Sequence, residues 1–264
     1  MKTIVVATDF SPSAENAMLY AGELANNINC SIVLLHVYAI PVGMHEVPML
    51  MVSTDELKNN AEKGLSRAKE LLKANFSAVE VHTESRLGDV ISELRDVCKN
   101  INPVLIVVGK HGASGVEEII FGSTSFSIIR HITYPVIVVP DRFKNYRVSN
   151  AGLAIDADIE TVCVDQIKKV RNELKFLLHI VHVKQENGAS LEATKLVSEL
   201  NSNYSTVFDN EFSHGIEMYI ANNDIDLLII LPRKHNLVER LFFKTHTKEL
   251  LKKISIPIMC LCEN

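Results

Sequence analysis

The chain contains no tryptophan, and aromatic residues make up only 6% of its composition. No apolar run approaches the ~20 residues that a membrane-spanning helix needs, and the first residues read as a strand without a signal-peptide pattern. The formal net charge of −5 gives no general affinity for nucleic acid or for anionic membranes. With 47% hydrophobic residues, the composition favours a cytoplasmic protein with an aliphatic α/β core.

Paired cysteines are also missing. Five cysteines are scattered along the chain, and only Cys260 and Cys262 lie close together, on the same face of a predicted strand. Without a second pair nearby we expect no zinc site, and we interpret the cysteines as reduced thiols. The sequence shows no other metal-binding cluster, so no metal ligand is assigned.

Two common nucleotide motifs are absent as well. A P-loop requires G-x-x-x-x-G-K-[ST], but Gly109-Lys110 has neither the upstream glycine nor a following Ser or Thr. A dinucleotide fingerprint requires G-x-G-x-x-G after the first strand, whereas the apolar run Thr3–Ala7 is followed by Thr8-Asp9. These two loop types are therefore excluded.

A different glycine-bearing loop is present after a later strand. Val104–Val108 reads as a strand buried on both faces, and Ser123–Ser125 reads as the cap of a following helix. Between these segments stand the glycines Gly109, Gly112, Gly115 and Gly122. Glycine lets backbone N–H groups approach an anion, and a helix N-terminus adds partial positive charge. The segment is therefore typical of a phosphate-binding loop.

Strands and helices alternate along the first half of the chain. Strands are predicted at residues 3–7, 31–37, 78–84, 104–108 and 135–139. Helices are predicted at residues 12–26, 54–74 and 90–100, with a short one ending near residue 131. The methionine-rich segment 38–54 is open to two interpretations, a flexible hydrophobic cover or a lid beside the site.

The same order recurs in the second half. Residues 152–156, 178–183, 222–231 and 256–261 match residues 5–9, 32–37, 100–109 and 134–139. Four matched blocks in one order indicate a tandem duplication. We expect a first domain over residues 1–142 and a second over residues 150–264, with the charged segment Asp141–Ser149 as the linker.

Each half is predicted to form a doubly wound α/β domain, a five-stranded parallel sheet of order 3-2-1-4-5 with helices on both faces. Ligands of such sheets bind outside the carboxyl ends of the strands, where the strand order reverses between strands one and four. Asp9 ends the first strand and Gly109 ends the fourth. Two segments that are distant in the sequence therefore meet at one predicted crevice.

The final strands of the two halves, 135–139 and 257–261, would each leave an apolar sheet edge open. Such edges tend to pair, and the short linker holds the two halves at high effective concentration. We therefore predict that these strands pair antiparallel within one chain and form an intrachain pseudo-dimer. The sequence leaves open whether two tandem chains assemble further into a homodimer.

The second half does not keep the glycine loop. In a gapless alignment larger side chains replace its glycines, among them Lys244 in place of Gly122, although Asp156 stands where the first half has Asp9. A side chain at these positions obstructs the approach of a phosphate to the backbone. We interpret the second half as a degenerate copy that does not bind the nucleotide or binds it differently.

These motifs resemble the universal stress proteins of the ATP-binding type, in a tandem two-domain form. The resemblance is carried by Gly109-x2-Gly112-x9-Gly122-Ser123, by Asp9 at the end of the first strand, and by the segments Leu34–Val37 and Tyr134–Val139. It implies ATP, with or without magnesium, at the carboxyl ends of the strands. Carried over by position, Thr8, Asp9 and Val37 would contact the adenine. The ribose and phosphates would be held by Gly109, Lys110, His111, Gly112, Gly122, Ser123 and Thr124.

The resemblance implies a stress-response regulatory protein that binds ATP or a related adenine nucleotide in its first domain. The sequence shows no poised base, nucleophile or metal cluster, so we assign no catalytic residue and expect at most weak ATP hydrolysis. Two alternatives stay open: a slow ATP hydrolase or phosphate-transferring enzyme, and a scaffold or chaperone-like protein with a structural nucleotide. Neither the signal sensed nor the protein partner can be read from the sequence.

Overall fold

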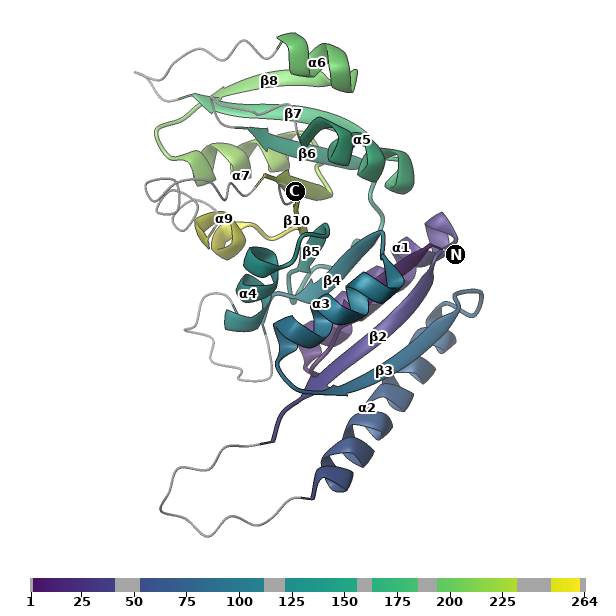
Figure 1. The fold of residues 1–264 in the computed structure, drawn as a ribbon. Coiled ribbons are helices and arrows are strands. Elements are labelled where there is room, and N and C mark those ends of the chain that lie inside the picture. The colour runs from purple at the N-terminus through teal and green to yellow at the C-terminus, as the bar shows by residue number, and fades with distance from the viewer. Residues whose placement is uncertain are drawn as a thin grey trace, which may run out of the picture.

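The computed structural model describes residues 2–40, 53–111, 122–155, 163–184, 194–231 and 248–261 (Figure 1). The elements of the first half are β1 (Thr3–Ala7), α1 (Pro12–Ile28), β2 (Ser31–Tyr38), α2 (Thr54–Asn75), β3 (Val81–Leu87), α3 (Val90–Ile101), β4 (Leu105–Gly109), α4 (Ser123–His131) and β5 (Val136–Val139). Those of the second half are β6 (Asn150–Ile155), α5 (Cys163–Leu174), β7 (Leu177–Lys184), α6 (Thr194–Leu200), β8 (Asn203–Phe208), α7 (Phe212–Asn222), β9 (Leu227–Ile230), α9 (Lys248–Lys253) and β10 (Ile258–Cys260). None of the helices in the described ranges is long and apolar enough to cross a membrane.

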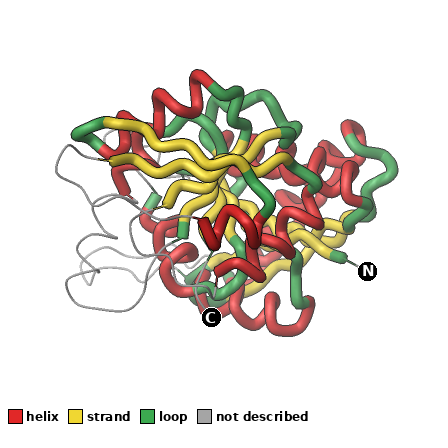
Figure 2. Tube along the Cα trace, turned by 90° about the horizontal axis from the view of Figure 1, so that it is seen from above, coloured by secondary structure: helices red, strands yellow, loops and turns green. Residues whose placement is uncertain are grey.

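The described strands form one 10-stranded sheet of order β3-β2-β1-β4-β5-β10-β9-β6-β7-β8. Within each half the neighbouring strands are parallel and follow the predicted order. The two halves meet at β5 and β10, which pair antiparallel. Figure 2 shows the sheet running through the molecule with helices on either side of it. The predicted fold and the intrachain pairing of the two final strands are both confirmed.

Both faces of the sheet are buried at its central strands, as their uninterrupted apolar runs predict. Alternation along β1 places Ile4 and Val6 on one face and Val5 on the other, and all three side chains are 0% exposed. Helices α1, α2, α5 and α6 pack on the first face, whereas α3, α4, α7 and α9 pack on the second. The core therefore consists of two aliphatic layers, one on each side of the sheet.

Helix α1 forms where the sequence predicts it, with a cap at each end. The Ser11 hydroxyl accepts a hydrogen bond from the N–H of Ala14 (3.2 Å), Pro12 opens the first turn, and Asn29 ends the helix in the left-handed conformation (φ 52°). The predicted apolar stripe of the helix is buried against the sheet. Because α1 packs on both β1 and β4, it can bring side chains to the point where those strands end.

Two local predictions are wrong. Strand β3 spans Val81–Leu87 rather than 78–84, because a turn follows α2 in which the N–H of Val79 donates to the Phe76 carbonyl (3.1 Å). This edge strand is mostly polar, so no apolar period fixes its boundaries in the sequence. The run Ser123–Ser125 does not cap α4 either, since the N-cap residue is Gly122 and the run forms the first turn.

The predicted linker, Asp141–Ser149, forms neither helix nor strand and connects the two halves. It is fixed along α1, where Phe143 and Tyr146 pack against the core. The buried Asn16 side chain anchors its start, because Nδ2 donates to the carbonyls of Pro140 (2.8 Å) and Phe143 (3.1 Å). The linker is thus a packed part of the fold, while the exact domain boundaries stay predictions.

Candidate functional site

A cavity lies at the carboxyl ends of β1 and β4, where the strand order predicts the ligand crevice. Its volume is about 160 Å³. The apolar part of its wall is formed by Ala7, Leu35, Val108 and Ile128, among others. The lining also includes predicted site residues, namely Thr8, Asp9, Val37, Gly109, His111, Gly122, Ser123 and Thr124. The fold therefore brings together predicted residues from both ends of the first half.

Thr8 and Asp9 form the turn that leaves β1. The buried Thr8 donates its N–H to the Leu35 carbonyl (2.9 Å), and its hydroxyl accepts the N–H of Phe10 (3.1 Å). The exposed Asp9 carboxylate accepts the N–H of Ser11 (3.0 Å). Because a carboxylate accepts several hydrogen bonds at once, Asp9 can bond this N–H and a ligand donor together.

Gly109 is required by the packing of α1 as well as by the shape of the cavity. A Cβ atom on Gly109 would lie 2.8 Å from the backbone oxygen of Ser13 and 2.7 Å from its Oγ. Contacts this short force backbone to move, because protein interiors are close-packed. Any side chain at this position would therefore push α1 away from β4. The sequence alone suggests only the approach of a phosphate as the reason for this glycine.

The N-terminus of α4 reaches the cavity without a side-chain cap. The N–H of its N-cap residue, Gly122, donates to the Lys110 carbonyl (3.1 Å), and the buried Ser125 hydroxyl donates to the carbonyl of Gly109 (2.8 Å). Within the described part of the chain, the N–H groups of Ser123 and Thr124 have no hydrogen-bond acceptor. These groups carry the positive end of the helix dipole, so this wall of the cavity suits an anion.

The Lys110 side chain reaches toward the second half. Its ammonium donates to the carbonyl of Lys252 (3.0 Å), in the last turn of α9, where the helix dipole favours a cation. Burial lowers the pKa of this ammonium. Lys110 is not among the residues that line the cavity. Its side chain therefore joins the halves in this structure, and the phosphate contact expected of it stays a prediction.

His111 lines the cavity and contacts the linker at the same time. Its Nδ1 lies 2.6 Å from a carboxylate oxygen of Asp141, and its backbone N–H donates to Oγ of Ser13 (3.1 Å). The Ser13 hydroxyl in turn donates to the other carboxylate oxygen of Asp141. Three residues, from the glycine loop, from α1 and from the linker, thus form a closed triangle. The sequence places Asp141 in the predicted linker but does not predict this contact.

Helix α1 does carry a sequence signal for the docked linker. Ser13 and Asn16 lie three residues apart on the helix beside the apolar stripe, and both are buried. Buried polar side chains are almost always hydrogen-bonded, so such a pair indicates a polar segment packed on the helix. That segment is the linker, since Tyr146 donates its hydroxyl to Oδ1 of Asn16 (2.8 Å).

An aromatic row lies beside the cavity, above the ends of β1 and β2. Phe10 adopts a positive φ of 63°, and its ring centroid lies 4.3 Å from that of His36, which in turn stacks on Tyr38 at 6.4 Å. The Nδ1 atom of His36 lies 2.7 Å from the Thr8 carbonyl. Gly64 of α2 makes room for the Phe10 ring, because a Cβ there would lie 2.5 Å from Cζ. The row fixes the turn that carries Asp9.

Several predictions fall outside the described residues. They concern Gly112, Gly115, Asp156, Lys244 and most of the methionine-rich segment. Within the described ranges, no group of three His, Cys, Asp or Glu side chains is placed to hold a metal ion. The structure therefore describes the start of the predicted glycine loop, at residues 109–111, and its end, from Gly122 onward.

The second half has different side chains at the equivalent strand ends. Ile155 of β6 pairs with His182 of β7, at the positions that correspond to Thr8 and His36. His182 is 4% exposed and its Nδ1 lies 3.4 Å from the Tyr204 hydroxyl. An apolar side chain thus replaces the hydroxyl of Thr8, which agrees with the interpretation of a degenerate copy.

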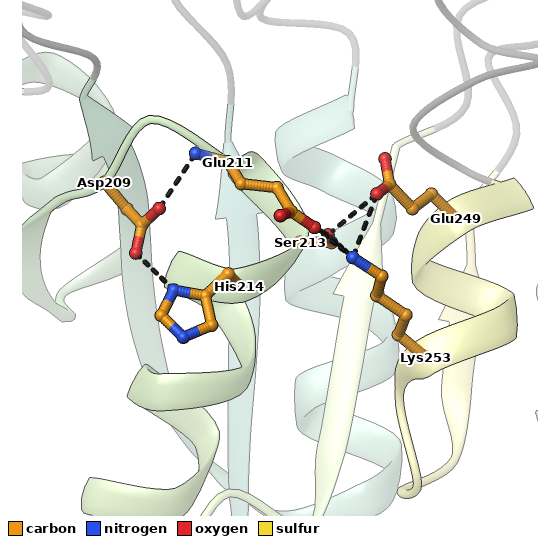
Figure 3. A network of polar contacts seen from close by, with 6 residues as sticks. All are labelled: Asp209, Glu211, Ser213, His214, Glu249 and Lys253. Atoms are coloured by element: carbon orange, nitrogen blue, oxygen red, sulfur yellow. Dashed lines mark hydrogen bonds and ion pairs between the residues drawn. The ribbon is translucent and has the colours of Figure 1, made fainter.

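A polar network at the carboxyl end of β8 joins α7 to α9 (Figure 3). Lys253 forms ion pairs with Glu211 and with Glu249 (3.1 Å), and its ammonium also donates to the hydroxyl of Ser213 (3.1 Å). The hydrogen bond between Lys253 and Glu211 raises the pKa of the lysine and lowers that of the glutamate. A lysine held in its charged form cannot act as a base toward Ser213, so the network links two helices.

The same network contains an exposed histidine pair. His214 Nδ1 lies 2.6 Å from Asp209. This hydrogen bond raises the pKa of His214, and the backbone N–H of Glu211, together with His214, lowers the pKa of Asp209. The pair fixes the loop between β8 and α7.

Comparison with known proteins finds relatives of one family. The family model described as the universal stress protein family matches residues 1–140. Universal stress protein Slr1230 of Synechocystis sp. is 26% identical in an alignment that covers 98% of this chain and 99% of that protein. Universal stress protein YxiE of Bacillus subtilis is 31% identical in an alignment that covers 52% of this chain and 97% of that protein.

Solved structures show the same tandem fold. A universal stress protein from Archaeoglobus fulgidus superposes with a TM-score of 0.76 at 17% identity, over 99% of this chain and 98% of that one. A functionally unknown protein from Pseudomonas aeruginosa superposes with a TM-score of 0.64 at 12% identity, over 100% of this chain and 93% of that one. At these identities the two structures support the fold alone. Because the family model matches more than half of the residues, the chain belongs to the universal stress protein family.

Proposed function

We propose that the first half binds ATP or a related adenine nucleotide in the cavity between β1 and β4, as part of a regulatory role in a stress response. The observation that carries this proposal is the uncapped N-terminus of α4, where the N–H groups of Ser123 and Thr124 can hold a phosphate. Thr8 and Asp9 also line the cavity and offer a hydroxyl and a carboxylate to the base or the ribose. The family assignment supports the stress-response role.

The size of the cavity limits what it can enclose. Its volume of about 160 Å³ lies below the ~300–1,000 Å³ typical of pockets for whole small molecules. The described cavity would therefore enclose one part of a nucleotide, with the remainder extending past it. Hydroxyls of Ser123 and Thr124 and the Asp9 carboxylate are oxygen donors of the kind that magnesium prefers, so a magnesium–ATP complex fits the donor set.

A slow ATP hydrolase or phosphate-transferring enzyme is the second candidate, and one observation favours it. His111 lines the cavity and is oriented by the Asp141 carboxylate, which is the arrangement that proton transfer by histidine uses. Steady-state assays separate the two candidates. Binding without catalysis predicts ATP turnover far below the ~1–10³ s⁻¹ of ordinary enzymes, whereas turnover above about 1 s⁻¹ that disappears in His111→Ala favours the enzyme.

Nucleotide retention tests the proposal directly. The full chain is incubated with a mixture of nucleotides, separated from unbound ligand, denatured, and the released small molecules are identified by mass spectrometry. We expect adenine nucleotides to be enriched over guanine and pyrimidine nucleotides. Equal recovery of all nucleotides, or none, contradicts the proposal. The Gly122→Lys variant provides the matched control and is expected to release none.

A further inference from the structure

We infer that Asp141, the first residue of the linker, is a positioning residue for the nucleotide site of the first half. It holds the His111 imidazole so that Nε2 is the ring nitrogen offered to a bound phosphate. The inference rests on the proposed nucleotide binding and extends the site beyond the glycine loop. It makes the segment that joins the two halves part of that site.

The first step is the hydrogen bond that the His111 imidazole makes. His111 lines the cavity, and its Nδ1 lies 2.6 Å from the Asp141 carboxylate. A carboxylate only accepts hydrogen bonds, so the proton of this bond sits on Nδ1. Within the described part of the chain no partner occupies Nε2. In the imidazolium form the N–H on Nε2 can donate a charge-assisted hydrogen bond to a phosphate oxygen.

The second step is that Asp141 itself is held in place. Its other carboxylate oxygen accepts the hydroxyl of Ser13, and the same hydroxyl oxygen accepts the backbone N–H of His111 (3.1 Å). Asn16, one turn further along α1, binds the carbonyl of Pro140, the residue before Asp141 (2.8 Å). Helix α1 thus holds the Asp141 carboxylate through Ser13 and the backbone just before Asp141 through Asn16. A site that orients a ligand group needs side chains held in this way.

These contacts distinguish the pair from an ordinary surface ion pair. Exposed pairs contribute little because both side chains must be ordered for one contact. Here Ser13 orders the carboxylate and the loop backbone independently of the ion pair. Asp141 does not line the cavity, so it acts on a ligand through His111.

A double-mutant cycle on the full chain tests the inference, with ATP affinity measured by calorimetry. Asp141→Ala is expected to weaken binding roughly tenfold, the size of one lost hydrogen bond to a charged group. His111→Ala is expected to weaken it similarly, and the double variant to bind no more weakly than His111→Ala alone. Lys144→Ala is the matched linker control, because its ammonium contacts Asn16 (3.3 Å) and not Asp141, and it should bind like the wild type.

A second readout needs no ATP. Nitrogen-15 NMR of the free chain, at a pH where the His111 imidazole is neutral, should show its single proton on Nδ1 in the wild type, and Asp141→Ala should shift that proton toward Nε2. A neutral wild-type imidazole that carries its proton on Nε2, additive losses in the cycle, or unchanged affinity in Asp141→Ala each overturn the inference while leaving nucleotide binding intact. Failure of the wild type to bind any adenine nucleotide overturns the proposed function and, with it, this inference.

Discussion

Ile137 in β5 lies opposite Met259 in β10, and the two residues occupy equivalent positions in the duplicated sequence. The pseudo-two-fold axis that relates the halves therefore passes between them. The Pro135 carbonyl accepts the N–H of Ile106 in β4, and the Val139 carbonyl accepts the N–H of Lys110, the residue after β4. The backbone of Ile137 therefore also faces β4. Ile137 and Met259 thus form a non-hydrogen-bonded pair, in which side chains approach closely, and both are 0% exposed.

Truncating this pair should destabilise the chain and reveal a coupling between the halves. Ile137→Ala and Met259→Ala are each expected to lower the free energy of unfolding by about 2–5 kcal/mol. The double variant should lose less than the sum, because the first truncation already removes the contact between them. Denaturant unfolding monitored by circular dichroism measures all three.

Ile32→Ala provides the control for that cycle. Ile32 is equally buried but lies in β2, separated from β5 by β1 and β4. Its effect should add to that of Ile137→Ala, since distant sites are independent. If the stability losses of Ile137→Ala and Met259→Ala also added, this would contradict the packing of the two side chains at the junction of β5 and β10.

Replacing Gly109 should lower stability even without nucleotide. The Cβ atom of Gly109→Ala would meet the Ser13 backbone, so we expect a loss of about 1–3 kcal/mol from overpacking. Gly152→Ala is a milder control, because its Cβ would lie 3.3 Å from Cγ2 of Ile225, a side chain that can shift. Thermal unfolding of both variants checks this, and equal melting temperatures would contradict the packing role of Gly109.

Asn16→Ala should release the linker from α1. The variant leaves the Pro140 and Phe143 carbonyls and the Tyr146 hydroxyl without their partner, at a cost of about 1–3 kcal/mol. Trypsin should then cut the linker, which contains Arg142, Lys144 and Arg147, faster than in the wild type. The exposed Asn27→Ala on the same helix is the control, and equal cleavage rates in both variants would count against a docked linker.

The contribution of the His214 and Asp209 pair to folding stability should depend on pH. The pKa of His214 is raised above its ordinary value of 6.5. The stability that the charged histidine contributes is therefore complete below pH 6.5 and is lost as the pH rises through the raised pKa. The pKa of Asp209 is lowered from 3.8, so on the acid side the contribution is lost only as pH falls through that lower pKa. NMR titration should show a drop in the His214 pKa in Asp209→Asn, and an unchanged pKa would contradict the contact.

The sequence predicts the sheet well because its apolar strand pattern is periodic and occurs in both halves. Apolar strands of fixed spacing, occurring twice, determine the strand order and the meeting of Asp9 with Gly109 at one crevice. The boundaries of β3 are less certain in the sequence, since a polar edge strand has no apolar period. The contact of His111 with Asp141 could not be predicted, because it depends on how the linker packs on α1.

Calorimetric titration of the full chain with ATP, beside the Gly122→Lys variant, tests the central claim most directly. Gly122 has a φ of −56°, which any residue adopts, so the substitution places a side chain at the uncapped start of α4 without straining the backbone. We expect one site per chain in the wild type and no binding in the variant, with both chains folded. Two equal sites per chain, or full affinity in Gly122→Lys, would contradict the claim.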